Sequence, residues 1–262
     1  MSDSVCVLVT GAAGRIGQAV CGSLLARGHR VRGFDVRETP NVEDSVVGDI
    51  TDATELSRAM QGVDVVVHLA ATPDEDDFMT RLLPNNIVGV YNVLEGARRA
   101  NVRRVVLASS GQVVMGHEGP WPITPEMPFT PRNWYASAKV MAEVAGQVYA
   151  YVHRLSVIVA RLGWCPRDER HAEELEHDEF GKDVYLSHRD AGRFFASAVE
   201  AQIDTPCCVV FAISKPLRKT RYDITAARDV LGYEPQDVWP EGTEIVFDRC
   251  FSNPTSDERN RG

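Results

Sequence analysis

Val5-Cys6-Val7-Leu8-Val9-Thr10-Gly11-Ala12-Ala13-Gly14-Arg15-Ile16-Gly17 is a short apolar run that passes directly into a glycine-rich turn. A continuous apolar run of this kind is typical of a parallel strand that is buried on both faces. After the turn, apolar residues recur every four positions, at Ile16, Val20 and Leu24. This spacing predicts a helix that ends near Gly28. A second strand is predicted over residues 30–34, so the stretch forms a strand–helix–strand unit.

The glycines of the turn have the spacing Gly-x-x-Gly-x-x-Gly, at Gly11, Gly14 and Gly17. Glycine lets the backbone turn sharply and approach a pyrophosphate, which then lies at the N-terminus of the following helix. Asp35 closes the second strand, where its carboxylate can accept hydrogen bonds from the ribose hydroxyls of an adenosine and repels a 2′-phosphate. We therefore expect NAD as the cofactor and NADP as the less favoured one. Arg37, two residues later, weakens this preference.

Apolar strands and amphipathic helices keep alternating as far as Ala160. Further strands are predicted over residues 46–50, 63–69, 104–108 and 155–160, and helices over 86–100 and 134–153. The alternation predicts an α/β fold, a doubly wound parallel sheet of the Rossmann type. Ligands in such sheets bind beyond the carboxyl ends of the strands. Small or polar residues stand at these ends, namely Asp35, Asp49, Ala70, Ala71, Ser109 and Ser110.

The pattern changes after Ala160. Residues 167–183 are highly charged and are expected to form a solvated loop or a short helix. Strands are then predicted over 184–186 and 207–213, and helices over 190–201 and 222–231. We predict one domain over residues 1–262. Its parts are a cofactor-binding core (1–162), a small C-terminal substrate lobe with returning strands (163–251) and a disordered polar tail (252–262).

Tyr135 and Lys139 are the candidate catalytic pair, because in a helix they lie one turn apart on the same face. A free tyrosine has a pKa of about 10. A neighbouring cation in a poorly solvated pocket favours the phenolate and lowers the pKa of the phenol. The spacing alone is common and is typical of an ordinary helix face. The Tyr/Lys spacing becomes informative in this chain because small and polar residues stand at the predicted strand ends, where a ligand would bind.

Composition excludes several other classes of function. The net charge of −9 argues against binding to nucleic acid or to an anionic membrane surface. No apolar stretch approaches the length of a membrane span. The six cysteines are scattered without a Cys-x-x-Cys pair, which fits the reducing cytoplasm, and no histidine or carboxylate trio has metal-ligand spacing, so we expect no metal.

Several motifs, in order, resemble the extended short-chain dehydrogenase/reductases of the NAD-dependent epimerase/dehydratase family, in a compact and atypical form. They are Thr10 to Gly17, Gly48-Asp49-Ile50, His68-Leu69-Ala70-Ala71, Asn86 to Leu94, Ala108-Ser109-Ser110, Tyr135-Ala136-Ser137-Ala138-Lys139 and Leu231-Gly232-Tyr233-Glu234-Pro235. Within the family the chain is most similar to the uronate dehydrogenases. Arg161-Leu162-Gly163-Trp164-Cys165 and the compact length carry this closer similarity.

The resemblance implies a role for each matching residue. Tyr135 is the implied acid/base, Lys139 binds the nicotinamide ribose and lowers the pKa of Tyr135, and Ser110 bonds the reacting oxygen. Asn86 holds a proton-relay water or stabilises its helix. The implied cofactor-binding residues are Gly11, Ala13, Gly14, Arg15, Ile16, Gly17, Asp35, Asp49, Ile50, Leu69, Ala70, Ala71, Tyr135 and Lys139.

The substrate side departs from the uronate dehydrogenase pattern. Gly111-Gln112 stands where those enzymes tend to have Asn-His, and Trp164 replaces a small serine. The arginine that clamps a substrate carboxylate has no unambiguous match, and Arg167 and Arg170 are candidates by proximity only. We expect the substrate site to be lined by Thr72, Gln112, Trp164 and Arg167.

These features favour an NAD-dependent oxidoreductase that oxidises a hydroxyl of a small sugar acid or sugar. One alternative is a sugar-nucleotide epimerase with tightly held NAD, although the 20 residues between Gly163 and Val184 leave little chain for a nucleotide-binding lobe. Dehydration is disfavoured because Gly111-Gln112 offers no Asp-Glu pair. A non-catalytic NAD(P)-binding regulator is the second alternative. The resemblance also implies a homodimer through helices 86–100 and 134–153.

Overall fold

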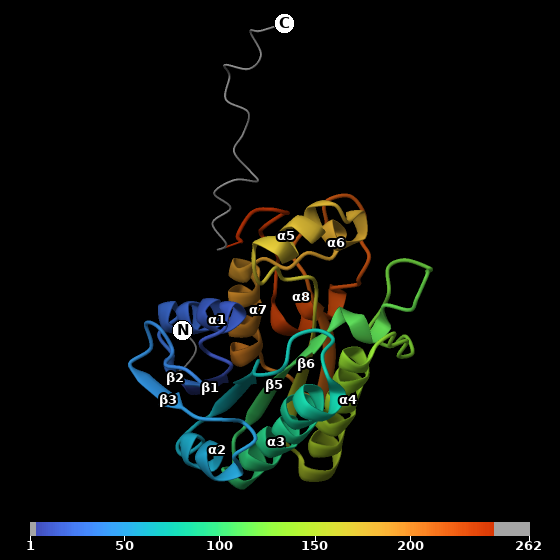
Figure 1. The fold of residues 1–262 in the computed structure, drawn as a ribbon. Helices are drawn as coiled ribbons and strands as arrows, with labels where there is room; N and C mark the ends of the chain where they lie inside the picture. The colour runs from blue at the N-terminus through green and yellow to red at the C-terminus, as the bar shows by residue number, and fades with distance from the viewer. Residues whose placement is uncertain (1–3, 244–262) are drawn as a thin grey trace, which may run out of the picture.

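Seven parallel strands form one sheet in the order β3-β2-β1-β4-β5-β6-β7 (Figure 1). The computed structural model describes residues 4–243. The strands are β1 (Cys6–Thr10), β2 (Arg30–Asp35), β3 (Asp44–Val47), β4 (Val65–His68), β5 (Arg104–Ser110), β6 (Ser156–Leu162) and β7 (Cys207–Ala212). The chain adds strands on one side of β1 and then on the other, so the order reverses between β1 and β4. In a doubly wound sheet the ligand crevice lies at this reversal.

Helices cover both faces of the sheet (Figure 1). One face carries α1 (Arg15–Ala26), α7 (His188–Glu200) and α8 (Thr225–Leu231). The other carries α2 (Ala53–Ala59), α3 (Gly89–Arg99) and α4 (Trp134–His153). Alternation along β1 serves both layers, since Val7 and Val9 join the first core and Cys6 and Leu8 the second. Every residue of β1 is buried, which explains the continuous apolar run.

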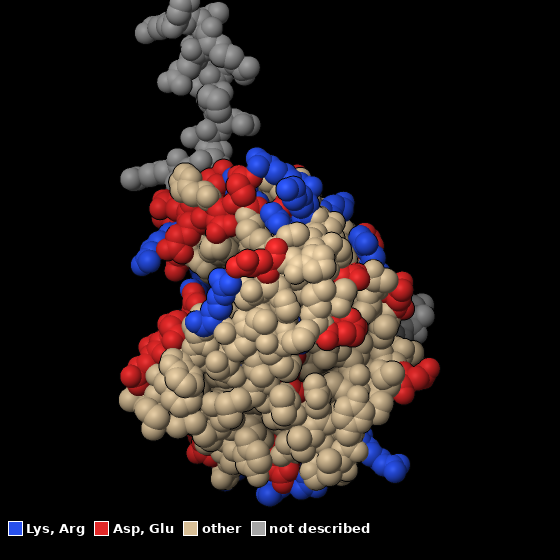
Figure 2. All heavy atoms as spheres, turned by 90° about the vertical axis from the view of Figure 1, so that its right-hand side faces the viewer, with Lys and Arg blue, Asp and Glu red and all other residues tan. Residues whose placement is uncertain are grey.

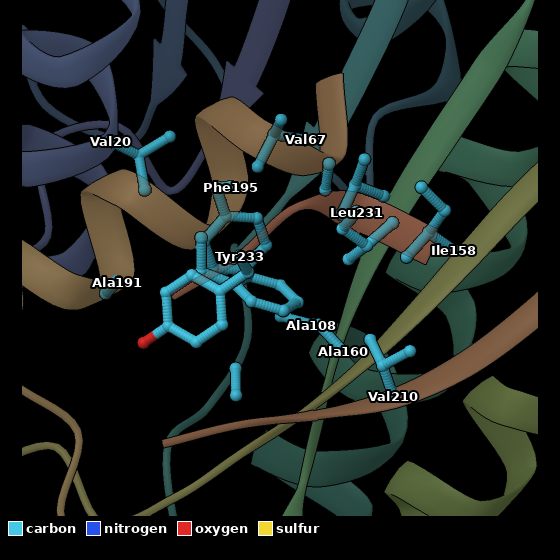
Figure 3. Close-up of a cluster of buried hydrophobic side chains, with 14 of the residues drawn as sticks. Val20, Val67, Ala108, Ile158, Ala160, Ala191, Phe195, Val210, Leu231 and Tyr233 are labelled. Atoms are coloured by element: carbon cyan, nitrogen blue, oxygen red, sulfur yellow. The ribbon is translucent and has the colours of Figure 1, made fainter. Parts of the chain in front are cut away.

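The core on the α1 side is made of aromatic and branched side chains that α7 and α8 press onto the sheet. Figure 3 shows Phe195 of α7 beside Tyr233, which follows α8, above strand residues such as Ile158 and Val210. Helices α1 and α7 lie against each other because Gly192 has no side chain. A Cβ atom at Gly192 would lie 2.7 Å from the carbonyl oxygen of Ala19.

Several predicted elements of the first half have other bounds in the structure, including β2, which extends to Asp35, and β5, which extends to Ser110. The helix expected from Asn86 starts earlier, as the wide π-helix η1 (Phe78–Val88), and continues as α3. Pro84 lies inside η1 and has no N–H to donate, so it breaks the α-helical ladder. The strand predicted over 46–50 is β3, which ends at Val47, and the one predicted over 63–69 is β4, over Val65–His68.

The second half also differs from the prediction. The strand predicted over 184–186 is only a single bridge between Trp164 and Tyr185. The charged segment 167–183 forms two short helices, α5 (Glu169–Glu176) and α6 (Glu179–Asp183), which Asp168 and Asp178 cap at their N-termini. The chain then returns through α7 to β7, which extends the main sheet beside β6. The predicted tail over 252–262 and the end of the predicted lobe lie outside the described residues.

No helix within residues 4–243 combines the length and apolarity that a bilayer crossing needs. No group of three or more histidine, cysteine or acidic side chains in the same residues could hold a metal ion.

A buried ion pair fixes α4 to the sheet. Glu143 of α4 is fully buried, and its carboxylate accepts hydrogen bonds from Arg161 of β6 at 3.0 Å and from the Ser109 hydroxyl of β5 at 2.5 Å. The Arg161 guanidinium also lies between the rings of Phe129 and Phe211. Both charges of this ion pair therefore have partners, which offset the cost of burying them in an interior of low dielectric constant.

We predict that Glu143→Ala lowers the free energy of unfolding by about 3–5 kcal/mol, because Arg161 is left as an unpaired buried charge. Urea denaturation followed by circular dichroism measures this loss. The control is Glu43→Ala at an exposed position, with an expected change within about 0.5 kcal/mol. Equal losses in the two variants would contradict the structural role of the pair.

Candidate active site

The glycine turn is packed so tightly that side chains are excluded from it. Gly11 has a φ of +72°, and a Cβ atom there would lie 2.7 Å from the backbone nitrogen of Ala70. A Cβ atom on Gly17 would lie 2.1 Å from the carbonyl oxygen of Gly11. Gly14 is the N-cap of α1 and has no side chain to cap the first N–H groups. The exposed end of a helix lined by glycine backbone fits the pyrophosphate of a dinucleotide.

Asp35 lies against this turn, at the end of β2. Its carboxylate accepts hydrogen bonds from the Ala13 N–H at 3.1 Å and from the Arg37 N–H at 3.2 Å. The Arg37 side chain donates back to the Ala13 carbonyl at 3.3 Å. The structure thus places the acid beside the glycine turn and places a guanidinium next to it. Both groups lie where they can act on the adenosine end of a dinucleotide.

The other residues predicted to bind the cofactor differ in exposure. Arg15 is exposed at the start of α1, and Ile16 packs partly into the first core. Asp49 is exposed and accepts hydrogen bonds from Thr51, so it serves as a turn residue, while Asp52 caps α2. The Ile50 side chain is buried against Gly89, where α3 begins.

The residues after β4 face the glycine turn across the strand-order reversal. Leu69, Ala70 and Ala71 are half-buried there, and the Leu69 N–H bonds the Thr10 carbonyl. The Thr10 hydroxyl lies 2.7 Å from Nδ1 of His68, which joins the ends of β1 and β4. Burial lowers the pKa of His68 to about 3, with the Lys139 charge as a smaller cause. His68 is therefore a neutral, structural residue at physiological pH.

Tyr135, Lys139 and Ser110 come together at the end of β5. Asn133 caps α4 through the Ala136 N–H and so sets Tyr135 in its first turn. The Ser110 hydroxyl hydrogen-bonds the Tyr135 phenol. Lys139 is buried, with Nζ 5.7 Å from the centroid of the Tyr135 ring and 3.0 Å from the Ala108 carbonyl, to which it donates.

The pKa of Tyr135 departs from the sequence-based expectation. Burial raises the pKa of Tyr135 to about 12, and the hydrogen bond from Ser110 opposes this rise. Burial also lowers the pKa of Lys139 to about 8, against the charge of Glu143. Lys139 is not among the causes that act on the pKa of Tyr135; its ammonium donates to the Ala108 carbonyl, and desolvation sets the direction in which the Tyr135 pKa moves.

Asn86 has both polar atoms of its amide bound to one residue. Its Oδ1 accepts from the Thr72 N–H at 2.8 Å and its Nδ2 donates to the Thr72 carbonyl at 3.0 Å. The side chain is 1% exposed. These contacts fix the segment after β4, so we assign Asn86 a positioning role as a proposal.

Each of the four predicted substrate residues contacts other residues of the protein, and their lining of a substrate pocket stays a prediction. Gln112 and Arg167 both bond Asp74. Thr72 is buried and donates its hydroxyl to the Arg81 carbonyl. The Trp164 ring lies 5.2 Å from the His171 ring, centroid to centroid, in a tilted arrangement, and its buried N–H has no hydrogen-bond acceptor within residues 4–243. Arg170 lies on α5 with an exposed side chain paired to Glu174, away from this group.

The sequence analysis did not include the acidic run 74–77 among the site residues, and so it missed the contacts that this run makes. Asp74 bonds Arg167, and the Glu75 carboxylate accepts from the Tyr135 backbone N–H at 2.8 Å. Asn133 was also missed, although it caps α4 and donates to Gln112 at 2.9 Å. The available signal was the position of the run in the chain, because it follows the end of β4 and precedes η1.

Residues 7–164 match the NAD dependent epimerase/dehydratase family. The chain is 34% identical over 256 residues to the NAD-dependent glucose-6-phosphate dehydrogenase of Haloferax volcanii, covering 90% of this chain and 95% of the relative. It is 33% identical over 248 residues to the L-arabinose 1-dehydrogenase (NAD(P)(+)) of the same organism, covering 88% and 96%. The solved structure of a mutated uronate dehydrogenase superposes with a TM-score of 0.76 at 29% identity, covering 89% of this chain and 82% of that chain.

We predict that Asp35→Asn raises the affinity for NADP relative to NAD by about tenfold, because it removes the carboxylate that repels a 2′-phosphate while leaving Arg37 beside it. Titration of the protein with each dinucleotide, followed by calorimetry, measures the ratio. The control is Asp49→Asn, whose carboxylate bonds its own turn and which should change both affinities alike. An unchanged ratio in Asp35→Asn would show that this acid does not face the ribose.

Proposed function

Since the chain belongs to the NAD dependent epimerase/dehydratase family, we propose that it oxidises a hydroxyl group of a small sugar or sugar acid with NAD as the hydride acceptor. The coarser conclusion, an NAD-dependent sugar oxidoreductase, rests on its relatives. The observation that supports the finer proposal is the proximity of Ser110 and Lys139 to Tyr135. A non-catalytic regulator has no need of all three.

Each of the three residues has a chemical task in the proposed reaction. Tyr135 as the phenolate takes the proton of the substrate hydroxyl and becomes a neutral phenol, and Ser110 holds the same substrate oxygen by a hydrogen bond. Bound NAD supplies the acceptor for the hydride that leaves the substrate carbon. Lys139 supplies the positive charge that stabilises the phenolate before it takes the proton.

The buried environment explains why Lys139 matters. The pKa of Tyr135 is about 12, above the ordinary value of about 10, so the phenolate needs stabilisation before it can act as a base. The Lys139 ammonium is the cation nearest to the ring in residues 4–243 that is itself buried. A desolvated cation is worth more to an anion than an exposed one, because the surrounding dielectric constant is low.

We predict that Tyr135→Phe lowers kcat by about 10²–10⁴-fold, because the variant has no group that takes the substrate proton, while NAD still binds. The rate of NADH formation with a panel of sugars measures the loss, and calorimetry measures NAD binding. The control is Tyr151→Phe, an exposed tyrosine of the same helix, which should keep the parental rate. Turnover by Tyr135→Phe at the parental rate would contradict the proposed mechanism.

Accumulation of NADH together with the oxidised product in the same assay also distinguishes a dehydrogenase from an epimerase.

We further propose that two copies associate through α3 and α4. Both helices expose large apolar side chains, namely Tyr91, Met141, Val144, Val148, Tyr151 and Val152. Figure 2 views the molecule from the α4 side and shows a broad surface with few charged residues. A contiguous exposed apolar surface marks an interaction site, and a second copy offers the matching patch for a two-fold interface.

We predict that Val148→Glu shifts the protein from dimer to monomer, because each copy would bring a charge into the apolar interface. Analytical ultracentrifugation measures the mass. The matched control is Val230→Glu on α8, an exposed valine outside this surface, which should leave the mass unchanged. A monomeric parental protein would contradict the proposal.

A further inference from the structure

Arg167 is a cation whose charge acts on Tyr135, and it is already paired. Its Nη1 donates to the Pro73 carbonyl at 2.9 Å, and its Nη2 donates to the Asp74 carboxylate at 3.2 Å. Recognition of a substrate carboxylate or phosphate by arginine uses two parallel N–H donors. In this chain both of these Arg167 donors are already engaged, one by the Pro73 carbonyl and the other by an oxygen of Asp74.

Asp74 is held in place from several directions. Its backbone has a φ of +76°, and its carboxylate accepts from the Glu75 N–H at 3.0 Å and from Gln112 at 3.5 Å. Gln112 in turn accepts from Asn133, the N-cap of α4, at 2.9 Å. The ion pair is therefore part of a chain of contacts that ends one turn from the catalytic tyrosine.

The pair also lies within electrostatic reach of the reacting group. Among the causes that act on the pKa of Tyr135, the charge of Asp74 raises it and the charge of Arg167 lowers it. Glu75, the next residue, bonds the Tyr135 backbone directly. A substrate whose hydroxyl meets the Tyr135 phenol must therefore sit close to Asp74 and Arg167.

Other cations nearby have partners too. Arg81 pairs with Asp76 at 3.6 Å, and Arg170 pairs with Glu174 at 3.0 Å on α5. Asp76 and Asp77 add two more exposed carboxylates to the same loop. A bound anion that displaced Asp74 from Arg167 would leave the Asp74 carboxylate without its cation in a loop that also carries Glu75, Asp76 and Asp77, and each like-charge contact disfavours binding.

On the basis of the proposed function, we infer that the sugar oxidised by this protein is uncharged, and that Asp74 excludes an anionic sugar by occupying Arg167. The favoured substrate class is a neutral aldose, whose hydroxyl groups can bond the loop carboxylates and the amide of Gln112. Uronates and sugar phosphates are disfavoured as substrates. This discrimination depends on a small structural difference, because a uronate differs from its aldose at only one carbon.

The test compares matched pairs of sugars in the full-length protein with NAD. The rate of NADH formation is measured for glucose against glucuronate and glucose 6-phosphate, and for galactose against galacturonate. We expect kcat/KM of each neutral sugar to exceed that of its anionic counterpart by about tenfold or more, since one unfavourable charge contact of about 1.4 kcal/mol has this effect.

Asp74→Asn then isolates the residue, because asparagine keeps the shape and tolerates the positive φ of this position. We expect the kcat/KM ratio of uronate to aldose to rise by about tenfold in this variant, as Arg167 gains the freedom to bind a carboxylate. The control Asp76→Asn removes an acid of the same loop that contacts Arg81, and its ratio should stay within about threefold of the parental value.

The outcomes separate the inference from the proposed function. A parental preference for uronates or glucose 6-phosphate, or an unchanged ratio in Asp74→Asn, overturns the inference and leaves sugar oxidation standing. NADH formation with none of the five sugars, by protein that binds NAD, overturns the proposed function and the inference with it.

Discussion

The contact between the glycine turn and the end of β4 is the constraint on which the rest of the site depends. A Cβ atom at Gly11 would fall 2.7 Å from the Ala70 nitrogen, so the two backbones meet directly where the strand order reverses. The His68–Thr10 contact and the Leu69–Thr10 backbone hydrogen bond also join the ends of β1 and β4. Because these strand ends are fixed, the segments that follow β4 and β5 start from set positions. Lys139 and Glu143 then attach α4 to β5 and β6, which fixes the helix that carries Tyr135.

The buried and the local parts of the structure could be predicted from the sequence. Strand β1 is buried on both faces, so its apolar run has a single interpretation, and the glycines of the turn are fixed by backbone packing. Tyr135 and Lys139 share a helix face at any tertiary placement of α4. The fold class, the family and NAD as cofactor follow from such local signals and agree with the comparisons. The roles of the individual site residues stay predictions.

Long-range contacts set what the sequence could not predict. Nothing local shows that both amide atoms of Asn86 bond Thr72, or that Arg167 meets Asp74, which lies 93 residues earlier. The π-helix η1 arises from the missing N–H of Pro84 together with the cap at Asp77, a combination without a simple hydrophobic period. The pKa of Tyr135 depends on how far the effect of burial exceeds the effect of nearby charges, and this balance is set by the three-dimensional structure. A spacing of four residues indicates a neighbour and leaves its electrostatic effect open.

The family and the cofactor agree with the comparisons, and the substrate class is what we propose from the residues of this chain. Oxidation of the sugar carbon with transfer of its hydrogen to NAD is the central claim, and isotope transfer tests it most directly. A neutral aldose that carries deuterium on every carbon would be incubated with the parental protein and NAD, and the cofactor analysed by mass spectrometry. We predict that one deuterium enters the reduced cofactor for each sugar oxidised. Sugar conversion with no deuterium in the cofactor would contradict the claim.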